Sequence, residues 1–309
     1  MSNSLVNILE GIASRVSAGT TLDYRMGAQE SVENINPVDW ASGGAKDHDA
    51  TIVVLGISQL LEGEEGESLA SPSLGDRLDL NLPANQLEYL RKLKEGHDNA
   101  VIVVMTGGSP ITMPEVEKLA DAILWVWYPG QEGGNAVADL IFGNEVPSGK
   151  LPLTFPESVD QLPAYEDYSM KERGYRYATS TPLYPFRYGL SYSEFSFNDL
   201  HLDREELSAD ESLTVMDQVR HRGEMDAEEV VQLYISVPDP EGTQPLWSLK
   251  NFVRIALAKG ERTEVSFKLD KSMLEQFNAS GVTEIVPGEY TVYVGNGSPG
   301  KRSEELGVK

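Results

Sequence analysis

The sequence contains no cysteine, which excludes disulfide bonds, thiolate metal sites and cysteine nucleophiles. It also has no apolar run approaching the roughly 20 residues that a membrane-spanning helix needs. Residues 1–16 lack the basic start and apolar centre of a signal peptide. We therefore expect no membrane partner. The cellular location is unknown, and a soluble, periplasmic or secreted parent protein is compatible with the sequence.

Basic residues are scarce, because 25 lysines and arginines stand against 49 aspartates and glutamates, for a formal charge of −24. Such a charge repels nucleic acid, so we expect no nucleic-acid partner. The histidines are also few and show no metal-ligand spacing, which predicts no metal site. They are His48, His97, His201 and His221.

The 309 residues correspond to about two domains, and 40% of them are hydrophobic, enough to form real cores. In the first half, three continuous runs rich in β-branched residues predict strands buried on both faces of a parallel sheet. These runs span 51–56, 100–107 and 122–129. Helical patterns at 5–16, after Pro83 and after Gly134 alternate with them. The sequence therefore predicts a layered α/β sandwich with a mostly parallel sheet over 1–156.

The second half changes to alternating apolar and polar residues, which is typical of antiparallel strands with one buried face. The alternating segments are 213–219, 231–237, 265–269 and 290–294, separated by turn signals such as Lys259-Gly260. This pattern predicts an all-β immunoglobulin-like, fibronectin type III-like sandwich over 193–309. Segment 157–192 is rich in proline and tyrosine and is predicted to be an ordered connection that packs against its surroundings.

The loop after the first predicted strand, 57–77, is the main candidate for chemistry, because ligands gather at the carboxyl ends of parallel strands. It contains four closely spaced glutamates flanked by glycines: Glu62, Glu64, Glu65 and Glu67. Crowded carboxylates raise one another's pKa, as a general acid at neutral pH requires. The alternative is that this acidic loop is simply a solvated surface feature.

Other candidate sites have simpler structural interpretations. The glycines at 133–134 are explained by helix capping and close packing at least as well as by anion binding. Segment 107–110 is interpreted as a turn after the second strand, and Trp125 and Trp127 as packing residues rather than a sugar platform. We interpret Asp39 as part of a helix start, in its first turn.

Several long motifs resemble glycoside hydrolase family 3. WYPGQEGGNAVADLIFGNEVPSGKLPLTFP (127–156) resembles the signature of its second domain. YRY (175–177) and YPFRYGLSYSEF (184–195) resemble the segment joining that domain to a terminal fibronectin type III-like domain, which VVQLYISVPD, SLKNFVRIALAKGE and VPGEYTVYVGN resemble in turn. The resemblance covers about 35–297. One departure is Arg187, where the family usually has glycine.

The resemblance implies a retaining β-glycosidase acting on a β-linked oligosaccharide or glucoside, without metal or organic cofactor. Family members carry the nucleophile on an N-terminal barrel and the acid/base glutamate on the second domain. Glu65, which with Gly66 precedes Gly75-Asp76-Arg77, is the first choice for the acid/base, with Glu67 and Glu64 as alternates. Glu62, Asp76 and Arg77 are candidate substrate-binding residues.

The chain is expected to lack the nucleophile, because residues 1–50 are too few for a barrel of roughly 250 residues. Val38-Asp39-Trp40 is similar to the family's nucleophile element, but we reject that assignment for this reason. A barrel on the parent chain or a separate chain would complete the enzyme, and a homodimer is a further expectation. The alternative function is a non-catalytic carbohydrate- or protein-binding module, or an inactive fragment.

Overall fold

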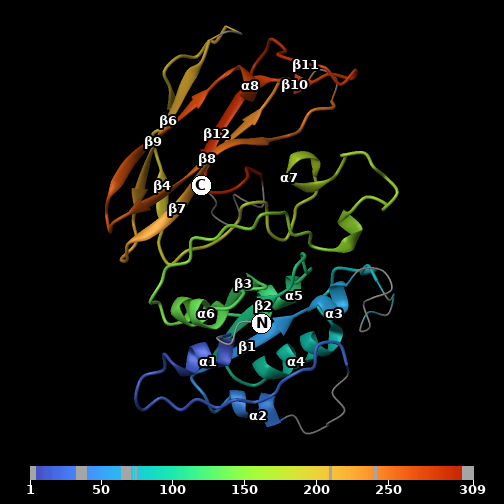
Figure 1. The fold of residues 1–309 in the computed structure, drawn as a ribbon, viewed down its shortest axis with the longest axis vertical. Helices are drawn as coiled ribbons and strands as arrows, with labels where there is room; N and C mark the ends of the chain where they lie inside the picture. The colour runs from blue at the N-terminus through green and yellow to red at the C-terminus, as the bar shows by residue number, and fades with distance from the viewer. Residues whose placement is uncertain are drawn as a thin grey trace. The chain divides into compact units, whose positions relative to one another are not determined.

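The structure is a computed structural model that describes residues 5–32, 40–63, 71, 73, 75–208, 211–239 and 242–300. The chain forms two compact units (Figure 1). The first comprises Met1–Glu145 and Glu157–Val159, and the second Val146–Pro156 and Asp160–Lys309. Over the described ranges, no helix is long and apolar enough to cross a membrane.

The first unit is built on a three-stranded parallel sheet, as the apolar runs predict. Its strands β1 (Ala50–Gly56), β2 (Ala100–Thr106) and β3 (Ala122–Trp127) lie in the order β1-β2-β3. The central strand β2 is largely buried, and Val103 and Val104 are both inaccessible to solvent. The expected burial on both faces is wrong for β3 and for part of β1, where Val54 is exposed. Each of these edge strands has a neighbour on one side only.

In the described part of the first unit, six helices surround or extend this sheet. The longest begins directly after Pro83, as predicted, and buries Leu90 and Leu93. The N-terminal helix is shorter than predicted: its Leu9 is partly exposed, whereas Ile12 is buried. The helices are α1 (Ile8–Ala13), α2 (Trp40–Ala45), α3 (Gln59–Glu62), α4 (Ala84–Lys94), α5 (Pro114–Leu119) and α6 (Gly133–Ile141).

Helices α1 and α6 pack so closely that only glycine fits at their contact. A Cβ on Gly134 would lie 2.0 Å from the carbonyl oxygen of Asn7, and one on Gly11 would lie 1.9 Å from that of Gly134. The N–H of Gly134 donates to the carbonyl of Val6 (3.0 Å), so the start of α6 is occupied by the chain itself. Close packing therefore accounts for the glycines at 133–134, as the sequence indicated.

The second unit contains two larger antiparallel sheets, as the alternating pattern predicts, and a small antiparallel pair of β10 and β11. One has the order β12-β7-β8, and in the other β6 pairs with β4, β5 and β9. Val215, Val231 and Leu233 lie in the core of buried side chains. The strands are β4 (Phe195–Phe197), β5 (His201–Leu202), β6 (Leu213–His221), β7 (Ala227–Ser236), β8 (Ser248–Leu257), β9 (Arg262–Leu269), β10 (Gln276–Phe277), β11 (Thr283–Glu284) and β12 (Thr291–Gly295), with the short helix α8 (Lys271–Leu274).

The connecting segment packs against the face of β7 that points away from this core. It contains the 3-10 helix η1 (Val159–Gln161) and helix α7 (Gly174–Tyr177). The rings of Tyr175 and Phe186 stack with centroids 4.2 Å apart, and Tyr175 meets the buried Tyr234 edge-on at 6.0 Å. Residues that alternate with the core positions of β7 are thus buried by this segment, which explains why β7 is buried on both faces along most of its length.

A buried ion pair joins Lys150, which precedes this segment in the chain, to β7. The Nζ of Lys150 lies 3.0 Å from Oε1 of Glu229, and their side chains are only 4% and 3% exposed. Lys150 also donates to the carbonyl of Gly189 (2.7 Å), and Glu229 accepts from the side-chain amide of Asn296 (3.1 Å). Both charges are therefore desolvated and held by further hydrogen bonds, the condition under which a buried pair is tolerated.

The α1–α6 contact yields a first prediction. Gly134→Ala should destabilise the protein by about 1 to 3 kcal/mol, because the added methyl group forces two backbones apart. Gly43→Ala is the control, since a Cβ there meets nothing within 4 Å and alanine favours the helix. Urea unfolding followed by circular dichroism measures both, and equal stabilities of the two variants would contradict the close packing.

The ion pair yields a second prediction. Glu229→Gln should cost about 3 kcal/mol of unfolding free energy, because it leaves the cation of Lys150 buried without its counter-charge. The neighbouring Glu228→Gln is the matched control on the same strand. Glu228 forms an exposed ion pair with Arg254 (2.8 Å), so its loss should cost at most about 1 kcal/mol. Thermal and urea unfolding report the difference.

Candidate functional site

The loops that follow β1, β2 and β3 meet at one edge of the sheet, because parallel strands present their carboxyl ends together. The strand end at Gly56 is unusually close to β2: a Cβ there would lie 1.9 Å from the carbonyl oxygen of Thr106, and the backbone has φ +138°. Glycine is therefore required at this position. The polypeptide then enters α3, with Ser58 as its N-cap.

The start of the first loop is held by side chains from elsewhere in the unit. The amide of Gln86 accepts from the N–H of Gly56 (2.8 Å) and donates to its carbonyl (2.7 Å). The same amide donates to the carbonyl of Glu30 (2.7 Å), whose carboxylate accepts from the N–H of Ser58 (2.5 Å). Gln86 is buried, so this support is rigid.

The carboxylate of Glu62 is the centre of the site. It ends α3 and accepts hydrogen bonds from the N–H of Gly108 (2.8 Å), the hydroxyl of Ser109 and the hydroxyl of Tyr128 (2.5 Å). Gly108 and Ser109 follow β2, and Tyr128 follows β3. One side chain therefore connects the loops of all three strands, and its oxygens are already engaged by donors.

Arg77 approaches the same group from the far end of the acidic loop. Its Nη2 donates to the hydroxyl of Ser109 (2.8 Å) and to the carbonyl of Pro110 (2.8 Å), while its Nη1 is buried without a hydrogen-bond partner among the described residues. Burial lowers the pKa of Arg77, and the negative charge of Glu62 opposes this shift. The guanidinium is charged at neutral pH and keeps an unused donor.

Tyr128 completes the cluster as a neutral hydroxyl. Burial, together with the hydrogen bond to Glu62, raises its pKa to about 12. The site thus combines a fixed anion, a cation with a free donor and a protonated phenol, all suited to binding a ligand rich in hydroxyl groups.

The structure brings together two of the residues predicted from the sequence, Glu62 and Arg77, through Ser109. Asp76 lies in an exposed turn, where its carbonyl accepts from the hydroxyl of Ser73 (2.8 Å). Neither Glu62 nor Arg77 bonds to it. The remaining candidates, Glu64, Glu65 and Glu67, lie outside the described residues, as does Asp39.

Sequence reasoning missed Ser109 and Tyr128. The interpretation of 107–110 as only a turn is incomplete, because this segment supplies two of the three donors to Glu62. The available signal was topological: both residues directly follow strands whose carboxyl ends share an edge with the acidic loop. Trp125 and Trp127 pack edge-to-face with centroids 5.4 Å apart, but both are only half-buried, so packing against a core accounts for them in part.

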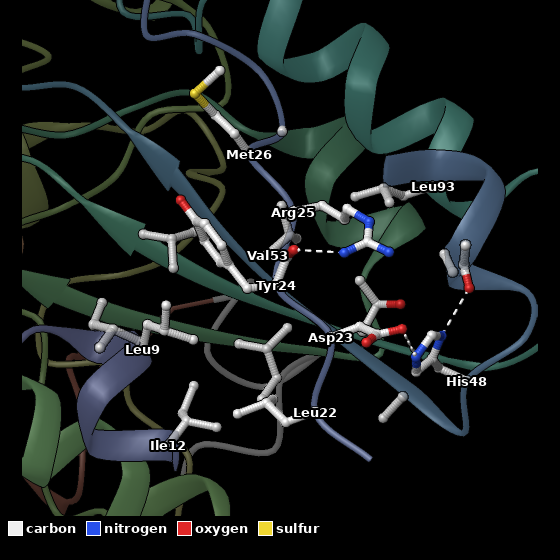
Figure 2. Close-up of a pocket in the computed structure, with 18 of the residues that line it drawn as sticks. Leu9, Ile12, Leu22, Asp23, Tyr24, Arg25, Met26, His48, Val53 and Leu93 are labelled. Atoms are coloured by element: carbon white, nitrogen blue, oxygen red, sulfur yellow. Dashed lines mark hydrogen bonds and ion pairs between the residues drawn. The ribbon is translucent and has the colours of Figure 1, made fainter. Parts of the chain in front are cut away.

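A separate cavity of about 410 Å³ lies in the first unit, between segment 21–28, α1 and β1 (Figure 2). Leu9, Ile12 and Leu22 gather on one side of it, while Asp23 and His48 form an ion pair on the other (3.2 Å). A hydrogen bond with the carbonyl of Gly44, aided by the charge of Asp23, raises the pKa of His48. None of the Glu62 cluster lines this cavity. In the described part of the chain, no group of three potential ligands could hold a metal ion.

Two protein-family models match the chain. Residues 1–192 match the model of the glycosyl hydrolase family 3 C-terminal domain, and 229–298 match that of a fibronectin type III-like domain. The chain belongs to glycoside hydrolase family 3. The α/β sheet with its loops thus corresponds to the family's C-terminal domain, followed by the fibronectin-like sandwich.

Family 3 relatives agree with this placement. The chain is 32% identical to the periplasmic beta-glucosidase of Salmonella typhimurium, over 96% of this chain and 41% of the relative. It is 40% identical to a xylan 1,4-beta-xylosidase of Xylanibacter ruminicola, over 82% of this chain and 29% of the relative. The chain therefore spans less than half of the length of these relatives.

Solved family 3 structures share the fold. A β-glucosidase from Erythrobacter marinus superposes with a TM-score of 0.80 at 29% identity, covering 95% of this chain and 42% of that one. A GH3 beta-glucosidase from Bifidobacterium adolescentis gives a TM-score of 0.80 at 27% identity, covering 96% and 44%. Both match across the two units of this family 3 chain.

The Glu62 cluster yields a third prediction. Glu62→Gln should lower the pKa of Tyr128 from about 12 toward the ordinary tyrosine value, because it removes the negative charge that opposes ionisation of the phenol. Burial contributes most of the shift, so the pKa should fall only part of the way. NMR titration of ring-labelled tyrosine, assigned with Tyr128→Phe, measures it. An unchanged pKa would mean that Glu62 and Tyr128 do not interact.

Proposed function

We propose that this chain is the C-terminal part of a retaining β-glycosidase and supplies its general acid/base from the loop after β1. The observation that carries the proposal is the clamped carboxylate of Glu62, fixed by donors from the loops of β2 and β3 at the start of the acidic segment. Glu65 lies three positions after Glu62 in the sequence. A loop whose first residues are fixed can hold a catalytic side chain at a defined place.

Retaining hydrolysis requires two carboxylates about 5 to 5.5 Å apart. In the proposed mechanism Glu65 protonates the glycosidic oxygen as the bond to the anomeric carbon breaks, and a carboxylate on a barrel domain bonds that carbon. Glu65 then takes a proton from water, which displaces the enzyme carboxylate from the sugar. The barrel is supplied by the parent chain or by a separate chain.

Glu62 has a different role in this proposal. Its oxygens are occupied by three donors, so it positions the loop rather than transferring the proton. Arg77 has an unused buried donor that suits a sugar hydroxyl, and Asp76 in its exposed turn is a further candidate for substrate contact. Glu67 and Glu64 stay the alternates to Glu65.

The substrate class follows from the relatives, which are named as beta-glucosidases and beta-xylosidases. We infer a β-linked glucoside or xyloside, or a β-linked oligosaccharide with such a terminal sugar. In a glucoside and in a xyloside alike, the glycosidic oxygen accepts the proton from Glu65. The acid/base chemistry therefore does not depend on which sugar is bound. A homodimer remains an untested expectation.

The fourth prediction tests the acid/base. With a barrel domain present, Glu65→Gln should reduce kcat for an alkyl β-glucoside by roughly 10² to 10⁴. It should impair bond cleavage in a dinitrophenyl glucoside far less, because that leaving group departs without a proton. Burst-phase and steady-state kinetics separate the two steps. Glu95→Gln, exposed at the end of α4, is the control.

Two outcomes would contradict the proposal. Full activity in Glu65→Gln, Glu67→Gln and Glu64→Gln alike would remove the acid/base from this loop. Substantial turnover of an aryl β-glucoside by the purified chain alone would show that no barrel is needed. It would also favour a nucleophile within these 309 residues.

A further inference from the structure

Arg187 occupies a turn position that ordinarily belongs to glycine. The N–H of Tyr188 donates to the carbonyl of Pro185 (3.1 Å), which closes a four-residue turn with Arg187 in its third place. The backbone of Arg187 has φ +66°. Turns with a positive φ at this place take glycine because other residues are strained there. The turn therefore keeps the backbone conformation that glycine ordinarily adopts, although the residue is an arginine. The arginine side chain is placed there at a conformational cost.

The guanidinium of Arg187 lies between two aromatic rings. Its Cζ is 5.1 Å from the centroid of Phe186 and 5.6 Å from that of Phe252 on β8. Its Nε is buried without a hydrogen-bond partner, and no carboxylate pairs with it in the described ranges. An unsatisfied guanidinium is notable in a chain with 49 acidic and 25 basic residues, where counter-charges are abundant.

Two more cations directly follow residues that pair with or pack against Tyr234 of β7. Lys250 occupies a bulge in β8, between Asn251, which pairs with Leu233, and Leu249, which pairs with Tyr234. Arg176 follows Tyr175, whose ring packs on Tyr234. Burial and the charge of Arg176 lower the pKa of Lys250, and the charge of Glu275 opposes this shift. Bulges commonly redirect a side chain next to a functional site.

Tyr234 pairs with Leu249, the residue before Lys250, and packs against Tyr175, the residue before Arg176. Burial raises the pKa of this tyrosine, and the positive charge of Arg187 acts against the rise. Neither Lys250 nor Arg176 forms an ion pair with a described carboxylate. Arg187, Lys250 and Arg176 thus form no ion pair among the described residues, although the chain as a whole carries −24.

We propose that Arg187, with Lys250 and Arg176, forms a binding site for a saccharide that carries a carboxylate, such as a uronic acid. The planar guanidinium matches the two oxygens of a carboxylate, and Arg187 has donors unused within the described structure. Phe252 is 56% exposed beside it and offers an apolar surface to the C–H face of a sugar ring. All of these residues belong to the second unit.

The ligand class follows from the pairing of charge with an aromatic surface. A neutral sugar would leave the guanidinium unpaired, and a small free carboxylate would not use Phe252. The acidic remainder of the chain repels anions, so binding at this place depends on the three cations. Affinity is therefore expected to fall as salt is added, because part of the site is exposed to solvent.

The experiment titrates the whole chain with methyl β-glucuronide, methyl β-glucoside and acetate, using calorimetry and ligand-observed NMR. The glucuronide is expected to bind about tenfold more tightly than either of the others, a difference of roughly 1.4 kcal/mol. Arg187→Gly should remove this preference while keeping the fold, because glycine adopts φ +66° readily. Lys250→Met should weaken glucuronide binding severalfold, and Phe252→Ala should weaken it without changing acetate binding.

Arg204→Ala is the matched control, since Arg204 is a surface arginine paired with Glu211 (3.5 Å) and lies outside the β12-β7-β8 sheet. It should leave all three affinities unchanged. Equal binding of glucuronide and glucoside would overturn the proposal, as would full glucuronide affinity in folded Arg187→Gly. Acetate or an aspartate-rich peptide binding as tightly as the glucuronide would overturn the assignment to a saccharide.

Discussion

The parallel register of β1, β2 and β3 is the constraint from which the first unit follows. It carries three chain segments to the same edge of the sheet, so residues far apart in sequence must share one small space. Glu62 resolves this crowding because its carboxylate accepts donors from both neighbouring loops. Gly56 permits the approach of the strand ends, and Gln86 holds the exit from β1. The candidate site is therefore a result of sheet geometry before it is a matter of chemistry.

The second unit depends on a different balance. Its strand β7 is buried on both faces, by the core of the unit on one and by the connecting segment on the other. Aromatic stacking accounts for much of that cover, but the Lys150–Glu229 pair requires a defined arrangement, because each charge must find its partners to offset lost hydration. Through the hydrogen bond from Lys150 to the carbonyl of Gly189, the pair also holds the end of the connecting segment. Arg187 and its unusual turn lie just before Gly189 in the chain.

The hydrophobic periodicity of the sequence predicted those strands in which each face has the same surroundings along the whole strand. Strands β6, β7, β9 and β12 alternate or run apolar because one sheet face meets a continuous core, and β2 is apolar because both faces do. The pattern did not predict β8, whose exposed Phe252 and Val253 follow one another at a sheet edge with no single buried face. The contacts of Ser109 and Tyr128 with Glu62 were also missed, since they depend on the strand order, which no local pattern encodes. The choice of Glu65 came from resemblance to family 3 and stays a prediction.

Gln86 also affects the exposed edge of the parallel sheet. Its amide makes both of the hydrogen bonds that a neighbouring strand would make with Gly56, so the sheet edge is closed there by a side chain instead of a backbone. A strand from another chain that paired with β1 could therefore not extend its pairing to Gly56, where the loop with Glu62 begins. Protection of this part of the edge against pairing with another chain rests on a single side chain.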